Sequence, residues 1–312
     1  MDKGLVIRTT GSSCTVFTDE GLTRECHIKG NFRIRGIRST NPIAVGDRVT
    51  VETQPDGTTW IADIDDRRNY IVRRSTNLSK ETHILAANLD RAILLVTLRN
   101  PETSTTFIDR FLATAEAYRV PAILVFNKID LLTTPEQQAQ LSDLRTLYES
   151  LGYPTYAICA NRIDDPAALP LLDQLRGRIT LLSGNSGVGK STLLNALLGR
   201  EVTRTGQISA AHHKGMHTTT FSEMYPFLEE GTWIIDTPGI KGFGAVRMER
   251  EEVSHYFREI FRIGRDCRYS NCLHTGEPGC EVFQAACRGD IAASRMDSYL
   301  SMLGDCNEAK YR

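Results

Sequence analysis

Residues 184–191 read Gly184-Asn185-Ser186-Gly187-Val188-Gly189-Lys190-Ser191. The octapeptide matches the phosphate-binding loop G-x-x-x-x-G-K-[ST] and lies between an apolar run at 179–183 (ITLLS) and the helical pattern STLLNALLG. Glycines in such a loop let backbone N–H groups turn toward phosphate oxygens, and the dipole of the following helix favours the anion. We expect Lys190 to reach the β- and γ-phosphates and Ser191 to bind Mg²⁺, with Thr192 among the nucleotide-binding residues. A simple glycine-rich turn is the alternative, and the strand–loop–helix context disfavours it.

A second motif, Asp236-Thr237-Pro238-Gly239, follows the predicted strand TWIID. An acidic residue at the end of a strand near a phosphate loop commonly holds Mg²⁺ through water, and a backbone amide beside it can sense the γ-phosphate. We assign these roles to Asp236 and Gly239. Alone the string is only turn-like, but its position 46 residues after Lys190 strengthens the assignment.

A third motif, Asn127-Lys128-Ile129-Asp130, ends the apolar run at 122–127. The carboxylate of Asp130 can accept hydrogen bonds from both the N1–H and the exocyclic amine of guanine, a pair that adenine does not offer. Asn127 can support the loop and the base edge, and the stem of Lys128 can lie across the ring. A helix-capping turn is the alternative, and the company of the other two motifs favours guanine recognition.

Cys159-Ala160 lies at the end of the next predicted strand, 155–159 (TYAIC), where a supporting loop for the base is expected. The pair departs from the usual Ser-Ala of that loop. We include Cys159 and Ala160 in the nucleotide site on the strength of their position.

The segment 212–220, HHKGMHTTT, lies between the phosphate loop and the DTPG motif. A threonine hydroxyl in such a switch segment completes the Mg²⁺ shell when the γ-phosphate is present. The sequence offers three consecutive threonines, of which we choose Thr219. Thr220 also fits the start of a strand at FSEMYPF.

Patterns on either side divide the chain. Residues 73–246 alternate apolar runs with amphipathic stretches at 107–119 and 135–151, which is typical of a doubly wound α/β sheet. Residues 1–72 show short alternating strands and turns, which predict a small β-barrel of the OB type, although an SH3-like barrel would also fit. The arginines in and after this barrel are Arg33, Arg35, Arg38, Arg67, Arg68, Arg73 and Arg74. They could bind RNA, or they could belong to an ordinary solvated surface of mixed charge, and the sequence leaves both interpretations open.

The tail, 247–312, contains two helical stretches around a loop with the pattern Cys267-x4-Cys272-x-His274-x5-Cys280. Three thiolates and one imidazole form a suitable set for a closed tetrahedral Zn²⁺ site, which would fix a loop too short to fold by burial. Free cysteines in a helical tail are the alternative, and Cys287 is a substitute ligand.

Composition gives the chain an ordinary setting. With 41% hydrophobic residues, 24% charged residues and a formal net charge of −1, it resembles a soluble globular protein and has no global basic excess. No apolar run approaches the roughly 18 residues of a membrane span, and MDKGLVIRTT lacks the apolar core of a signal peptide. We therefore expect a cytoplasmic protein without membrane contact, where its eight cysteines favour metal binding over disulfides.

The order of the motifs is permuted. Ordinary regulatory GTPases run from the phosphate loop through the switch threonine and DxxG to NKxD, whereas here NKID precedes the phosphate loop by more than fifty residues. With the small N-terminal barrel, HTTT, DTPG and the Cys/His loop, the chain resembles the RsgA/YjeQ family of bacterial GTPases that depend on the small ribosomal subunit. The resemblance covers essentially the whole chain, including a domain junction at 77–95.

That resemblance implies an OB-fold (1–72), a circularly permuted GTPase domain (73–246) and an α-helical zinc-binding domain (247–312). It also implies a late maturation factor of the small ribosomal subunit that binds rRNA, hydrolyses GTP to GDP and phosphate, and acts as an assembly checkpoint and release switch. The implied cofactors are GTP or GDP, Mg²⁺ and one structural Zn²⁺ per chain, and we expect a monomer.

One departure concerns the hydrolytic step. Ile240 follows DTPG, where Ras-like proteins carry the glutamine that orients the attacking water. Because phosphoryl transfer depends on positioning and charge stabilisation, this loss should slow hydrolysis unless another group replaces the glutamine. His217 is a catalytic candidate, and a structural or solvent-facing role is equally open for it.

Two other functions would fit part of the sequence. The chain could be an RNA clamp whose nucleotide site only tunes affinity, with negligible turnover. It could also be a P-loop ATPase or small-molecule kinase, but an adenine pocket has no use for the carboxylate of NKID. Nucleotide affinity, followed by turnover with and without small subunits, separates the three.

Overall fold

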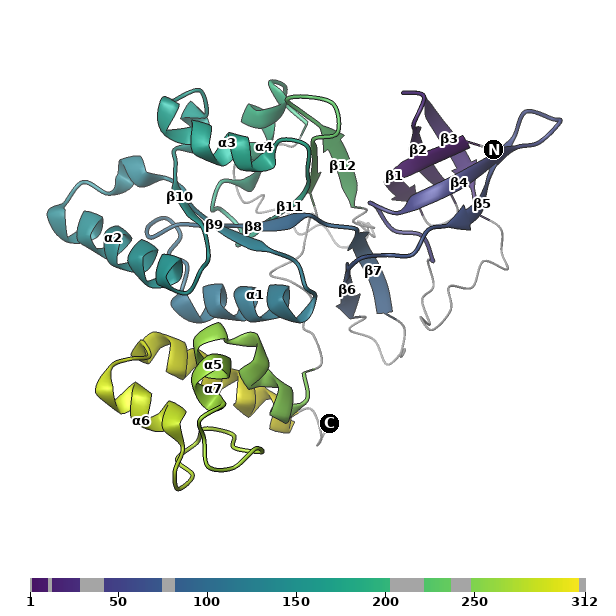
Figure 1. Cartoon of the computed structure of the whole chain (residues 1–312). Coiled ribbons are helices and arrows are strands. Elements are labelled where there is room, and N and C mark those ends of the chain that lie inside the picture. Colours follow the sequence, from purple (N-terminus) through teal and green to yellow (C-terminus); the bar gives the residue numbers. More distant parts are fainter. Residues whose placement is uncertain are drawn as a thin grey trace, which may run out of the picture.

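The computed structural model describes residues 2–10, 13–28, 42–74, 82–202, 222–236 and 248–308. Figure 1 shows a β-barrel beside a sheet covered by helices on both faces, with a helical unit packed under that sheet. Among the described helices, none has the combination of length and hydropathy needed to cross a bilayer.

The barrel contains β1 (Asp2–Thr10), β2 (Ser13–Thr18), β3 (Thr23–His27), β4 (Arg48–Thr53) and β5 (Thr59–Ile64). Its strand order is β1-β2-β3-β5-β4, and pairing of β1 with β4 closes it. Alternate side chains point inward because successive residues of a strand face opposite sides, so Val6, Val16 and Ile61 are fully buried. This five-stranded closed order confirms the OB-like prediction over the SH3-like one.

The central sheet has the order β10-β9-β8-β11-β13-β12. Its strands are β8 (Arg91–Val96), β9 (Ala122–Phe126), β10 (Thr155–Ala157), β11 (Ile179–Gly184), β12 (Glu223–Pro226) and β13 (Trp233–Asp236). All pair in parallel except β12, which runs antiparallel to β13. Every residue of β8 and β9 is buried, as expected for parallel strands covered on both faces.

Helices cover the two faces of this sheet, and the doubly wound prediction is confirmed (Figure 1). They are α1 (Thr105–Ala117), α2 (Pro135–Ser150), α3 (Leu169–Leu175) and α4 (Lys190–Leu198). Short 3₁₀ turns at Ile129–Leu131, Ala160–Arg162 and Pro166–Ala168 follow the strands. Phe111 of α1 packs in one core cluster with Leu94 and Leu124, whereas Leu193 of α4 packs in another with Ile93 and Leu95.

The barrel and the central sheet are joined by hydrogen-bonded strands. β12 pairs with β13 on one side and with β1 on the other, where Arg8 lies opposite Glu223. The ring of Phe17 on β2 lies 5.3 Å from that of Trp233 on β13, in an edge arrangement. A separate hairpin of β6 (Tyr70–Arg74) and β7 (Thr82–Ala87) lies between the two units in sequence. The barrel is thus in direct contact with β12, which follows the switch threonines in sequence, and with β13, which ends at the first residue of the DTPG motif.

The tail forms a helical unit against α1. It comprises a 3₁₀ helix (Arg250–Tyr256), α5 (Arg258–Gly264), α6 (Glu281–Arg288) and α7 (Ala293–Glu308). The fully buried Arg295 of α7 donates to Asp109 of α1 at 2.8 Å and to Glu259 of α5 at 2.6 Å. Tyr148 of α2 donates to the same Asp109 at 2.9 Å. A buried, charged network therefore ties the tail to the central unit.

Candidate nucleotide site and metal centre

The phosphate loop connects β11 to α4, as the sequence predicts. Gly184 and Gly189 have φ values of 147° and 103°. A Cβ at Gly184 would lie 2.5 Å from the carbonyl oxygen of Leu95, and one at Gly189 would lie 2.4 Å from Asn127 Nδ2. Only glycine fits at both positions, because the loop is pressed against the neighbouring strand ends. This close approach leaves the backbone N–H groups to line an anion site at the start of α4.

Lys190 points back into this loop. Its Nζ donates hydrogen bonds of 2.7 Å to the carbonyl oxygens of Gly184 and Asn185. Burial lowers the pKa of Lys190, and the nearby carboxylate of Asp236 acts in the opposite direction. The buried Asp236 is the last residue of β13. It lies opposite Leu182 of β11, and Leu182 is two residues before the phosphate loop begins. Lys190 and Asp236 therefore lie close enough for their charges to interact beside the phosphate loop.

Ser191 and Thr192 lie half-buried in the first turn of α4, directly after Lys190. Both residues thus lie at the start of the helix that follows the phosphate loop, which is where the phosphate-loop pattern has its serine or threonine. Thr219, His217, Gly239 and Ile240 lie outside the described residues, so their roles stay predictions.

Asn127 connects three loops that are far apart in sequence. Its Nδ2 donates to the carbonyl oxygen of Val188 at 2.8 Å, and its Oδ1 accepts from the backbone N–H of Ala160 at 2.8 Å. The side chain is buried and so has lost its water partners. Lys128, with φ of 60°, donates to the carbonyl oxygen of Gly187 at 2.7 Å and to that of Asn100. The loops that the sequence predicts to recognise the base are thus fixed against the phosphate loop.

Asp130 is exposed in the turn after Lys128, and the buried Cys159 supports it. The thiol of Cys159 donates to Asp130 Oδ1 at 3.1 Å. A thiol therefore makes the contact for which a serine hydroxyl is usual. Cysteine in place of serine thus still supplies a hydrogen-bond donor to Asp130. Sequence reasoning missed Arg162, whose Nη2 donates to Cys159 Sγ at 3.1 Å. The 3₁₀ turn Ala160–Arg162 brings this side chain back over Cys159, and the sequence carried no recognised signal for that turn.

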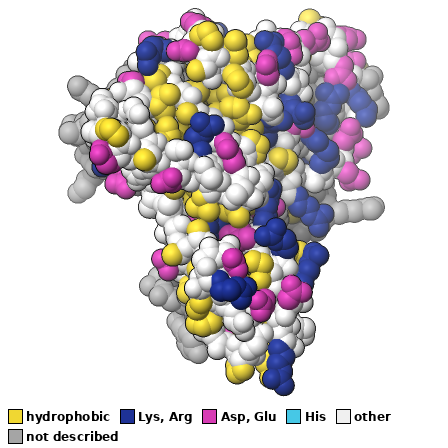
Figure 2. All heavy atoms as spheres, turned by 60° about the vertical axis from the view of Figure 1, so that its left-hand side comes forward, with side chains coloured by type: hydrophobic (Ala, Val, Ile, Leu, Met, Phe, Trp, Pro, Cys, Tyr) yellow, Lys and Arg dark blue, Asp and Glu magenta, His cyan; other side chains and the backbone are white. Residues whose placement is uncertain are grey.

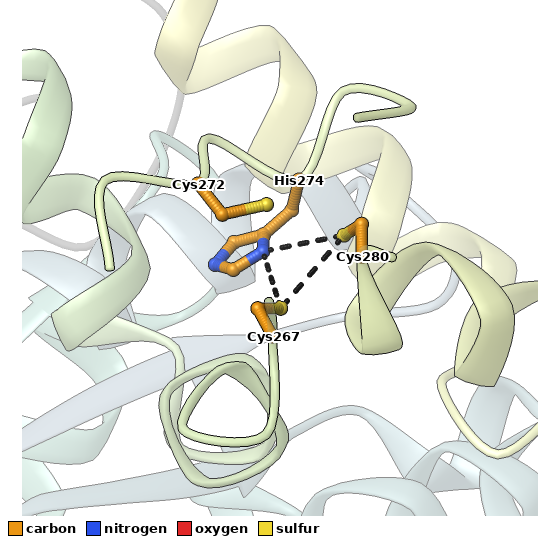
Figure 3. A group of neighbouring side chains, drawn as sticks. All are labelled: Cys267, Cys272, His274 and Cys280. Carbon is orange, nitrogen blue, oxygen red and sulfur yellow. Dashed lines mark hydrogen bonds between the residues drawn. The ribbon is translucent and has the colours of Figure 1, made fainter. Parts of the chain in front are cut away.

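The four predicted zinc ligands meet in the tail (Figure 3). His274 Nδ1 lies 3.6 Å from Cys267 Sγ and 3.5 Å from Cys280 Sγ, and these two sulfurs lie 4.0 Å apart. All four ligand atoms, including that of Cys272, lie within 4.8 Å of one another. Zn–S bonds of about 2.3 Å and Zn–N bonds of about 2.0 Å put tetrahedral ligand atoms roughly 3.5–3.8 Å apart. The cluster therefore fits a zinc ion.

Local hydrogen bonds hold the ligands in place. Cys280 caps α6, and its sulfur accepts from the backbone N–H of Phe283 at 3.3 Å. Glu277 accepts backbone hydrogen bonds from Leu273 and Thr275. Burial raises the pKa of Glu277, but these hydrogen bonds outweigh burial and lower the pKa to about 2. Cys287, the alternative ligand, is exposed on α6 and lies outside the cluster.

Comparisons place these features among known proteins. A family model described as RsgA GTPase matches residues 64–246, and one described as RsgA N-terminal domain matches residues 3–61. A small ribosomal subunit biogenesis GTPase RsgA from Bacteroides fragilis is 57% identical over 310 residues, which cover 99% of both chains. The crystal structure of YjeQ from Thermotoga maritima has a TM-score of 0.77 at 32% identity, over 98% of each chain. YloQ, a circularly permuted GTPase, has a TM-score of 0.75 at 24% identity, over 99% of this chain and 96% of its own, and so shares the fold.

Proposed function

Because the chain belongs to the RsgA family of GTPases, we propose that it binds the small ribosomal subunit and hydrolyses GTP to GDP and phosphate during late maturation of that subunit. The observation that carries the proposal is the contact of the NKID loop with the phosphate loop through Asn127. This contact assembles a guanine nucleotide site from motifs in permuted order. Hydrolysis then reports correct docking and releases the protein, which acts as a checkpoint.

The residues have separate tasks at this site. Asp130 selects guanine, while Lys190 and the backbone of the phosphate loop hold the β- and γ-phosphates. Ser191, Thr219 and, through water, Asp236 would hold the Mg²⁺ that the family implies, which neutralises charge developing on the phosphate oxygens. Gly239 contacts the γ-phosphate, and His217 is the candidate for positioning water.

RNA contact has support on both flanking units. His27 and Trp60 place their rings 5.0 Å apart on the barrel strands β3 and β5. On the tail, the guanidinium of Arg265 lies 5.0 Å from the centroid of the Phe261 ring. The exposed Phe261 beside a guanidinium, and the half-buried Trp60 beside the exposed His27, suit stacked bases and a phosphate backbone. Figure 2 shows Lys and Arg side chains gathered toward one side of the view, across the upper and lower parts of the molecule, with acidic side chains among them.

The arginines that follow the barrel differ in their availability. Arg67 pairs with the buried Asp47 at 2.6 Å and is itself buried, so it stabilises the barrel. Arg68 pairs with Asp90 at 2.9 Å but remains exposed and can face RNA. We place the protein in the cytoplasm as a monomer, where its partner is the small subunit and its rRNA.

Asp130→Asn should change the base preference of the nucleotide site from guanine to xanthine. The change removes a carboxylate that accepts two hydrogen bonds from guanine, each worth about 1.5–3 kcal/mol when one partner is charged. GDP affinity should therefore fall about 100-fold or more, whereas xanthosine diphosphate should bind more tightly, because its ring oxygen accepts from the new amide. Titration of both nucleotides measures this, with Asp143→Asn on the exposed face of α2 as the matched control. Unchanged GDP affinity would remove Asp130 from the base site.

The tail should hold one zinc ion per chain, bound by Cys267, Cys272, His274 and Cys280. Structural zinc contributes on the order of 10 kcal/mol, so its removal should unfold the loop between α5 and α6. Metal analysis and thermal unfolding with and without a chelator test this. Cys280→Ser should lose zinc, while Cys287→Ser should keep one ion per chain. Zinc that can be stripped without any change in thermal stability would contradict a structural role.

A further inference from the structure

A short hydrogen-bonded chain runs behind the base-recognition carboxylate. Arg162 Nη2 donates to Cys159 Sγ at 3.1 Å, and Cys159 Sγ in turn donates to Asp130 Oδ1 at 3.1 Å. Arg162 and Asp130 are exposed, whereas the thiol between them is buried. Arg162 belongs to none of the phosphate-loop or base-loop motifs. The reason for its contact with the Cys159 sulfur must therefore be sought elsewhere.

The two distances fix where the thiol proton lies. Asp130 offers only acceptor oxygens when ionised, so a sulfur 3.1 Å away must carry the proton between them. A thiolate there would place two anions in contact. The guanidinium, which is purely a donor, then occupies a lone pair of the same sulfur. The sulfur is thus an acceptor toward Arg162 and a donor toward Asp130.

A thiol alone is a weak hydrogen-bond donor. A cation that donates to the sulfur draws electron density from it, which polarises the S–H bond and strengthens its bond to the carboxylate. The same cation attracts Asp130 directly through space, and the hydrogen bond to Cys159 raises the pKa of Arg162. A serine hydroxyl would be a good donor without such help, so the need for the arginine follows from the presence of cysteine.

We propose that Arg162 is a positioning residue for guanine selection, which acts through Cys159 to hold the Asp130 carboxylate in the orientation that reads the base. This inference rests on the proposed guanine site. With Oδ1 fixed from behind, the carboxylate faces the N1–H and the exocyclic amine of guanine together. Without Arg162 the carboxylate turns more freely, and the contact with the exocyclic amine weakens most because it needs both oxygens aligned.

Binding of GDP and of inosine diphosphate, which lacks the exocyclic amine, tests this directly. Wild-type protein should prefer GDP, and Arg162→Ala should shrink the GDP-to-IDP affinity ratio about five- to tenfold. Cys159→Ser, which replaces the thiol donor by a hydroxyl donor, is measured as the parent of the double variant. In the double variant Arg162→Ala/Cys159→Ser the ratio should return close to wild type, because a hydroxyl does not need the guanidinium. Arg176→Ala is the matched control, since Arg176 is exposed and pairs with Asp173 and Glu229 instead.

The GDP-to-IDP affinity ratio decides whether the inference holds. A ratio that contracts in Arg162→Ala and recovers in the double variant supports the inference. An unchanged ratio overturns it, as does an equal loss of GDP and IDP affinity that serine does not rescue, since that pattern indicates a merely structural or long-range charge effect. If wild-type protein does not prefer GDP over ADP, the guanine site itself is wrong, and the inference falls with it.

Discussion

Lys190→Ala should reduce GTP hydrolysis by about 1,000-fold or more, while the fold survives. The reason is the position of Nζ inside the phosphate loop, where it donates to the carbonyl oxygens of Gly184 and Asn185. A cation held at developing phosphate charge contributes on the order of 4 kcal/mol to the transition state, and each 1.36 kcal/mol is about tenfold in rate. Phosphate release at saturating GTP measures the effect.

Arg178→Ala is a suitable control, because Arg178 is exposed just before β11 and its side chain lies at the opposite end of that strand from the phosphate loop. Thermal unfolding of both variants should match wild type, since the bonds lost in Lys190→Ala involve no core contact. Turnover near the wild-type rate in a folded Lys190→Ala protein would count against the phosphate-loop assignment.

The free protein should be a slow GTPase that the small ribosomal subunit accelerates by two or more orders of magnitude. Ile240 stands where a water-orienting glutamine is usual, so the free protein lacks that group. Holding water and switch residues in reacting geometry contributes several kcal/mol, which corresponds to roughly 100- to 1,000-fold. A partner that imposes this geometry therefore has a large effect.

The contacts of the barrel offer a physical route for that effect. β12 begins at Glu223, three residues after the last of the switch threonines, and it pairs with β1 of the barrel. β13 ends at Asp236, and its Trp233 meets Phe17 of the barrel at 5.3 Å between ring centroids. RNA that shifts the barrel thus acts on both strands. Phosphate release with subunits should show Phe17→Ala keeping the basal rate and losing most of the stimulation.

The sequence predicted the central sheet and the site loops well, because buried parallel strands appear as continuous apolar runs. The runs at 122–127 and 179–183 became β9 and β11 with their ends shifted by about one residue. The strand predicted at 155–159 stops at Ala157, since Cys159 begins a 3₁₀ turn there. The metal ligands were predictable because their spacing is local, and the geometry excluded Cys287.

Contacts between distant segments could not be predicted in the same way. The pairing of Arg8 with Glu223 joins strands more than 200 residues apart and rests on one register position. The buried Arg295 reads in sequence as one more charged helix residue, although it meets Asp109 across the unit boundary. Arg162 depends on a three-residue turn whose direction no periodicity shows. Each needs the tertiary structure, because propensity and motif spacing describe only neighbours along the chain.

Steady-state phosphate release by the free protein, by the protein with small subunits and by the protein with large subunits tests the central claim most directly. At equal GTP and protein concentrations, the account predicts slow release alone, release raised at least 100-fold by small subunits, and no comparable increase with large subunits. A free protein that already turns over at about 1 s⁻¹, in the usual range for enzymes, and gains nothing from small subunits would contradict it.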